Sequence, residues 1–71
     1  MSTEEAKDYS QENWHKVKGK FPEVWGRLTD DDLEKIQGKL EQLYGVLQEK
    51  YGYTRAEAER AYKEVRHRFK D

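Results

Sequence analysis

WHKVKGKFPEVWG at residues 14–26 is followed by a modified copy of itself, LEKIQGKLEQLYG, at residues 33–45. The two stretches align without gaps at a period of 19 residues, and both carry a lysine, a Gly-Lys pair and a final glycine at the same places. In both, apolar residues recur three and four positions apart, which is the spacing of a helix with one buried face. The repeat therefore predicts helices, and it contains no catalytic motif.

The composition is typical of one small folded domain. The chain has 71 residues, of which 41% are charged and 34% hydrophobic, and its net charge is -1. A domain this short buries only about 60% of the surface that its unfolded chain exposes, so we expect modest stability. Its two tryptophans, five tyrosines and two phenylalanines favour a folded core over disorder. The absence of cysteine excludes disulfides and thiolate metal ligands.

Nothing in the sequence indicates contact with a membrane. No apolar run approaches the roughly 20 residues that span a bilayer. The segment MSTEEAKD at residues 1–8 is too acidic and too polar for a signal peptide. We therefore expect a small hydrophilic protein in the cytoplasm.

The expected fold class is all-α, with a flexible acidic tail over residues 1–10 and a single helical domain over residues 11–71. The first helix is predicted to end near Lys20. Pro22 cannot donate a backbone hydrogen bond, and it disfavours the helical conformation at Phe21. A short helix is then predicted to begin at Pro22.

The second copy has Glu41 in place of the proline. A long helix is therefore predicted to run unbroken from Leu33 to Tyr51, with one apolar stripe, and to end at Gly52.

An N-cap and a capping box mark two helix starts. Thr29 is placed to accept a hydrogen bond from the amide of Asp32, and Thr54 with Glu57 repeats the arrangement before the last helix. The aspartates at 30–32 lie where the helix dipole favours negative charge. A calcium loop requires oxygen ligands at alternate positions, a glycine and a distal glutamate, and this pattern is absent.

We therefore predict four helices, two of them short, around one core. The core is expected to be led by the large apolar residues of the buried faces: Trp14, Phe21, Trp25, Leu40, Leu43, Leu47, Tyr62, Val65 and Phe69. The two tryptophans are core residues or exposed anchors of an interface, and the sequence leaves both open.

Several short motifs occur together between about residues 11 and 60. In chain order they are NW at 13–14, KGK at 18–20, WG at 25–26, LTDDDL at 28–33, GK at 38–39, QL at 42–43, a glycine at 45, YGY at 51–53 and AE at 58–59. Their combination resembles the CsbD-like family of small bacterial stress-response proteins. The resemblance implies a general stress-response protein of the cytoplasm. It also implies a fold that in some members is similar to sterile alpha motif domains, in which two helical hairpins pack across one another. The family has no agreed biochemical activity and no catalytic residues. Pro22 and the basic C-terminal helix depart from its usual pattern.

A candidate interaction face consists of Gly38, Gln42 and Gly45. On the predicted long helix these residues lie nearly opposite the apolar stripe. A glycine inside a helix costs about 0.5–1 kcal/mol relative to alanine. Two of them indicate a close neighbour from this chain or a partner, a deliberately labile helix, or simple tolerance of poor helix formers.

A candidate phosphate-binding stripe runs along the last helix. It consists of Arg60, Lys63, Arg66, His67 and Lys70. Such a stripe follows phosphates in nucleic-acid-binding proteins. Glutamates lie close by on the same helix and no aromatic residue alternates with the basic ones, which favours an ordinary solvated face.

The sequence offers no catalytic or metal-binding constellation. Neither His15 nor His67 has a second ligand at helical spacing, and no hydroxyl group has a base beside it. We expect no enzyme activity, no cofactor and no small-molecule substrate. The leading hypothesis is an interaction module that binds another protein or a second copy of itself. Nucleic-acid binding and protection of other molecules during water loss are the alternatives.

Overall fold

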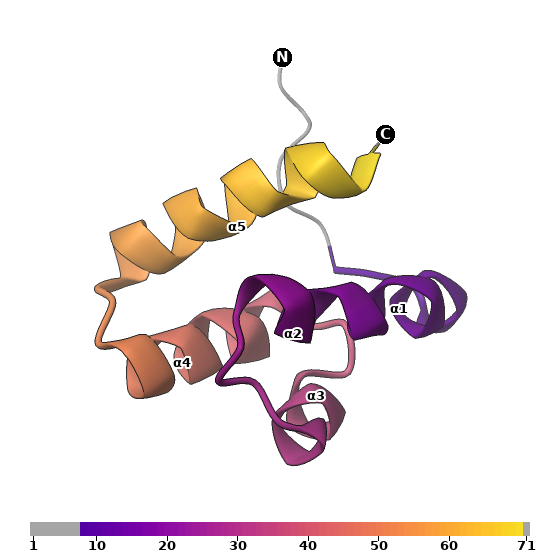
Figure 1. Cartoon of the computed structure of the whole chain (residues 1–71), viewed down its shortest axis with the longest axis horizontal. Helices are drawn as coiled ribbons and strands as arrows, with labels where there is room; N and C mark the ends of the chain where they lie inside the picture. Colours follow the sequence, from indigo (N-terminus) through magenta and orange to yellow (C-terminus); the bar gives the residue numbers. More distant parts are fainter. Residues whose placement is uncertain (1–7, 71) are drawn as a thin grey trace.

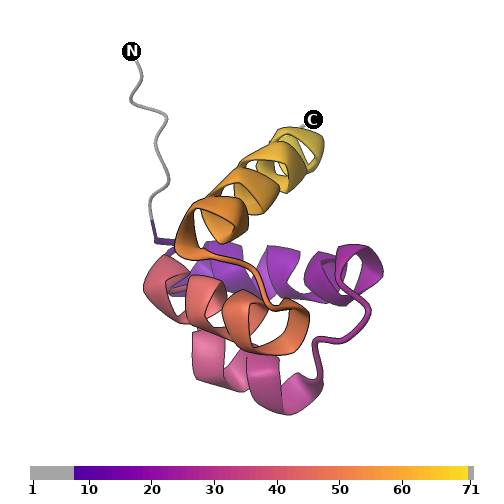
Figure 2. The same cartoon turned by 90° about the vertical axis from the view of Figure 1, so that its left-hand side faces the viewer.

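The computed structural model describes residues 8–70, with side chains described as far as residue 68. Every regular element in this part of the chain is helical, which confirms the all-α prediction. In chain order the elements are α1 (Gln11–Val17), the 3₁₀ turn η1 (Lys18–Lys20), α2 (Phe21–Val24), α3 (Asp30–Ile36), α4 (Leu40–Tyr51) and α5 (Arg55–Lys70). In both views of the molecule α5 lies at one end and α3 at the opposite end (Figures 1 and 2).

The sequence repeat is also a repeat of structure. The bounds of α1 and α3 differ by the same 19 positions that separate the two sequence copies. Their caps correspond as well, because Ser10 caps α1 and Thr29 caps α3 through a side-chain oxygen that accepts a backbone amide. Each copy therefore consists of a capped two-turn helix, a break, and a second helix.

The predicted unbroken helix from Leu33 to Tyr51 is wrong. The chain leaves α3 at Gln37 and Gly38, which have φ angles of 45° and 78°, and α4 begins at Leu40. Glycine adopts this left-handed region at no steric cost. The break sits at the same place in the repeat as η1 in the first copy, so it does not require a proline.

The expected effect of Pro22 on its neighbour is also wrong. Phe21 keeps helical angles, with φ −64° and ψ −46°. The predicted boundary near Lys20 is confirmed, because the 3₁₀ turn η1 separates α1 from α2 there. The Phe21 side chain is fully buried. Burial of an aromatic ring offsets the local preference against this conformation.

The predicted cap at Thr29 and the predicted capping box at Thr54 are confirmed, and Thr29 forms a capping box as well. The Thr29 hydroxyl accepts from the Asp32 amide at 3.2 Å, and the Asp32 carboxylate accepts from the Thr29 amide at 2.9 Å. Thr54 and Glu57 exchange the corresponding bonds at 3.1 and 2.9 Å. Gly52, with φ 72°, ends α4 as expected.

The predicted core is confirmed wherever side chains are described. Both tryptophans belong to it, while the side chain of Phe69 lies outside the described part. Sequence reasoning did not place Leu28 or Val46 in the core, although both are buried. The buried residues are Trp14, Phe21, Trp25, Leu28, Leu33, Ile36, Leu40, Leu43, Tyr44, Val46, Leu47, Ala58, Tyr62 and Val65.

Residues 8–10 form a strap that joins the two copies of the repeat. Ser10 caps α1, and the Tyr9 amide donates to the Gly38 carbonyl at 2.9 Å. The Asp8 carboxylate accepts from the Leu40 amide at 3.0 Å. That carboxylate supplies the side-chain cap that Lys39, the residue before α4, does not provide.

The strap also reaches the last helix. The hydroxyls of Tyr9 and Tyr62 are 2.6 Å apart, and the Tyr9 ring meets those of Trp14 and Phe21 at centroid distances of 6.0 and 6.3 Å. The expected flexible tail covered residues 1–10. Its first seven residues lie outside the described part of the chain, and its last three are the strap.

Candidate interaction surfaces

The three residues of the predicted interaction face are not on one surface. Gly38 is buried in the turn between α3 and α4, and a Cβ placed on it would lie 3.1 Å from the Tyr9 carbonyl oxygen and 3.3 Å from Trp14 Cβ. The close neighbour that this glycine accommodates is therefore the strap of its own chain.

Gln42 and Gly45 are exposed on α4, one helical turn apart. Apart from its chain neighbours and the backbone of α4 itself, no described heavy atom lies within 4 Å of a Cβ placed on Gly45. The "α4 face", meaning Gln42 and Gly45, is thus the part of the predicted surface that remains open to another molecule.

The basic stripe lies on the outer side of α5. Arg60, Lys63 and His67 are exposed, Arg66 is half-buried, and the side chain of Lys70 is not among those described. Neither Arg60 nor Lys63 forms an ion pair with another described residue.

The first turn of α5 is arranged differently. The Arg55 guanidinium binds Glu59 at 2.8 Å and Glu41 at 3.0 Å, and lies 4.9 Å from the centre of the Tyr44 ring. The hydrogen bonds that Arg55 donates to these carboxylates, the one to Glu59 first, raise the pKa of Arg55. This arginine is already occupied within the chain and is not part of an open basic surface.

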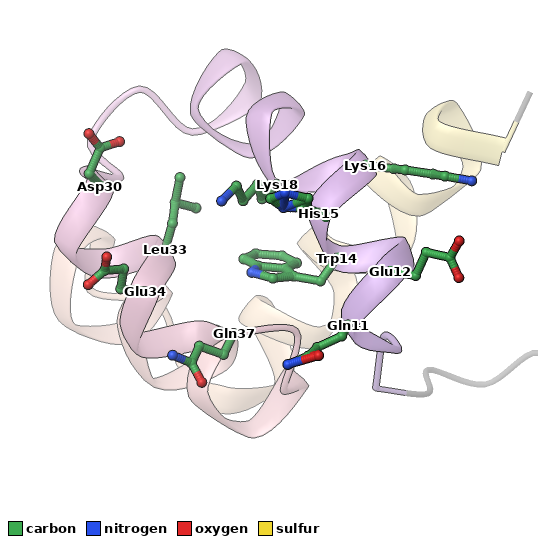
Figure 3. A pocket seen from close by; sticks show the side chains of 10 residues that line it. All are labelled: Gln11, Glu12, Trp14, His15, Lys16, Lys18, Asp30, Leu33, Glu34 and Gln37. Atoms are coloured by element: carbon green, nitrogen blue, oxygen red, sulfur yellow. The ribbon is translucent and has the colours of Figure 1, made fainter.

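Sequence reasoning missed a groove between α1 and α3 (Figure 3). It has a volume of about 1060 Å³ and is open to solvent on one side. Its lining residues are Gln11, Glu12, Trp14, His15, Lys16, Lys18, Asp30, Leu33, Glu34 and Gln37. Trp14 and Leu33, which are equivalent positions of the repeat, lie on its two sides, and each is only 8% exposed.

The two walls of the groove differ in charge. On the side of α1 and η1 the charged lining residues are Glu12, Lys16 and Lys18, whereas Asp30 and Glu34 lie on the side of α3. Figure 3 shows Glu12 and Lys16 pointing away from the opening, whereas Lys18 extends toward the α3 side, so Lys18 is the charge that this wall presents to the groove. The alignment of the two sequence copies shows that their charges differ at these positions, because His15 aligns with Glu34 and Lys18 with Gln37.

The perturbed side chains hold the fold together. Burial, and next the hydrogen bond to Tyr9, raise the pKa of Tyr62 well above its ordinary value. Burial, and next the charge of Glu59, raise the pKa of Tyr44. Both tyrosines therefore stay neutral at physiological pH. No three His, Asp or Glu side chains in the described part of the chain are placed to hold a metal ion.

A family model described as CsbD-like matches residues 8–60, so the match begins at the first residue of the strap. The chain belongs to the CsbD-like family. Within the part that the structure describes, this CsbD-like chain has no helix long and apolar enough to cross a membrane.

Curated relatives of the CsbD-like chain cover most of its length. A UPF0337 protein of Pectobacterium atrosepticum is 56% identical over 61 residues, which are 86% of this chain and 84% of the relative. The UPF0337 protein YjbJ of Escherichia coli K12 is 52% identical over 54 residues, 76% of this chain and 78% of the relative. Their names state no activity. No solved structure matches the chain.

Proposed function

We propose that this CsbD-like chain is a non-enzymatic stress-response protein of the cytoplasm, and that it binds a protein partner through the α4 face. The stress-response role follows from the resemblance of its motifs to those of the family. The observation that carries the interaction is Gly45. It lies in the middle of the 12-residue helix α4, and within the described part of the chain no residue packed against the helix uses the space left by its missing side chain.

The other glycines near α4 have reasons within the chain. Gly38 and Gly52 have φ angles of 78° and 72°, where side chains are strained. Gly45 has neither a positive φ nor a close neighbour, yet glycine costs about 0.5–1 kcal/mol in a helix interior. A partner whose backbone approaches α4 at this point would account for that cost.

The test places a photo-crosslinking residue at Gln42 and exposes stressed cells to light. We expect a defined protein adduct that is lost in Gly45→Leu, because the leucine side chain occupies the space of close approach. Gly19→Leu is the matched control, since Gly19 is also exposed with nothing within 4 Å and lies in η1. An adduct that persists in Gly45→Leu would contradict the proposal.

A second candidate is nucleic-acid binding through the basic stripe, favoured by Arg60 and Lys63, which are exposed and form no ion pair with another described residue. An amide-resolved NMR titration with short mixed-sequence DNA and RNA tests it. Phosphate binding requires shifts confined to the outer side of α5 that shrink as salt rises. Shifts that are absent, or insensitive to salt, would exclude this candidate.

A further inference from the structure

The groove between α1 and α3 has walls of opposite charge at its opening. Lys18 is half-buried beside the end of α1, and Glu34 is exposed on α3. No ion pair within the described residues uses either side chain. Both charges are therefore available to a second molecule.

A ligand of a single charge does not fit these walls. An anion that is attracted by Lys18 is repelled by Asp30 and Glu34. A cation is attracted by the two carboxylates but repelled by Lys18. The occupant must instead carry a positive and a negative charge, separated as the two charged walls of the groove are. A second copy of this chain meets this requirement, because it carries the same two charged walls.

Two-fold symmetry doubles the attraction. When two copies face each other across an isologous interface, a contact between Lys18 of one copy and Glu34 of the other occurs twice. The net charge of -1 leaves little overall repulsion between the copies. We propose that the α1–α3 groove is a self-association surface on which a second copy of the chain docks through reciprocal Lys18–Glu34 contacts.

The apolar part of this surface is small, because Trp14 and Leu33 are each only 8% exposed. The association therefore rests mainly on charge. It is weak, and it weakens further as salt screens the exposed pairs. The surface does not include the α4 face, so either proposal can fail while the other stands.

The test is sedimentation equilibrium of the full chain from about 10 μM to about 2 mM, the range in which weak association is measured. At low salt the wild-type average mass is expected to rise above the 8.6 kDa of the monomer with concentration, and at high salt to fall back toward it. Lys18→Glu and Glu34→Lys should each weaken association about tenfold or more, since like charges then face each other twice.

The decisive sample is a mixture of the two variants. In a heterodimer of the Lys18→Glu and Glu34→Lys chains, both contacts again join opposite charges, so association should return to the wild-type level. Lys35→Glu and Glu49→Lys are the matched controls, because these exposed residues do not line the groove. Circular dichroism checks that every variant is folded.

Three outcomes overturn the proposal: a wild-type chain that stays monomeric throughout at low salt, groove variants that behave like the controls, or a mixture that fails to associate. Gly45→Leu in the same assay should leave self-association unchanged. If Gly45→Leu removes the crosslink at Gln42 but leaves the average mass in sedimentation unchanged, the result therefore bears on the proposal for the α4 face alone.

Discussion

Gly38 and Gly45 differ in what a methyl group added to each would meet. At Gly38 the methyl would press on the Tyr9 backbone, and the positive φ adds strain. At Gly45 it would enter open space on a helix surface. The same residue type is thus required for the fold at one position and costs stability at the other.

We predict that Gly45→Ala raises the free energy of unfolding by about 0.5–1 kcal/mol, since alanine is the better helix former. Gly38→Ala should lower it by more than about 1 kcal/mol, because the left-handed conformation and the contact with Tyr9 both resist a side chain. Urea denaturation followed by circular dichroism measures both. A destabilised Gly45→Ala would show that Gly45 serves the monomer in a way its open surroundings do not reveal.

At the scale of the element, α3 is too short to be stable alone. Isolated helices below about 12 residues are marginal in water, and α3 has seven. Asp32 holds it at two points, accepting from the Thr29 amide and lying 3.0 Å from the Lys50 ammonium at the end of α4. The hydrogen bond from the Thr29 backbone, more than the one from Lys50, lowers the pKa of Asp32 below 3.8.

This pKa shift gives a pH dependence with a defined sign. The stabilisation by Asp32 is fully present above the unfolded-state pKa of about 3.8, and it is lost as the pH falls through the lower folded-state pKa. Asp32→Asn should therefore cost about 0.5–2 kcal/mol at pH 7 and progressively less under acid conditions. Thermal unfolding between pH 2 and about 7 measures this. Asp31→Asn, at an exposed position of the same turn, is the control; an equal, pH-independent loss in both variants would contradict the prediction.

At the scale of the whole molecule, the strap connects parts that are distant in sequence. Tyr9 contacts the α3–α4 turn through Gly38 and the last helix through Tyr62, 53 residues away. Tyr62 is only 1% exposed, whereas Tyr9 is half-buried. Removing the Tyr9 hydroxyl therefore leaves a buried hydroxyl behind, whereas removing the Tyr62 hydroxyl leaves one that is only half-buried.

Tyr9→Phe leaves the buried Tyr62 hydroxyl without a partner and should cost about 1–3 kcal/mol. Tyr62→Phe leaves a Tyr9 hydroxyl that water can reach and should cost about 0.5–1.5 kcal/mol. The double variant should cost less than the sum of the two. Urea denaturation of the three variants tests this order, and a larger loss in Tyr62→Phe would show that the Tyr62 hydroxyl has another route to solvent.

Features that depend on neighbours along the chain could be predicted from the residues alone. The two capping boxes, the end of α4 at Gly52 and the buried faces of the helices all follow from residues within a few positions of each other. Helix starts and buried stripes are local, so spacing alone reveals them. The same motifs also led to the CsbD-like family.

Features that depend on distant partners arise from the way the helices pack, and no local pattern contains them. The break at Gly38 is covered by Tyr9, which lies 29 positions earlier in the chain, and no helical periodicity contains that contact. The groove likewise exists only because α1 and α3, each a separate short helix, pack side by side. Periodicity shows which face of a helix is buried, but packing between helices chooses what covers it and which surfaces stay open.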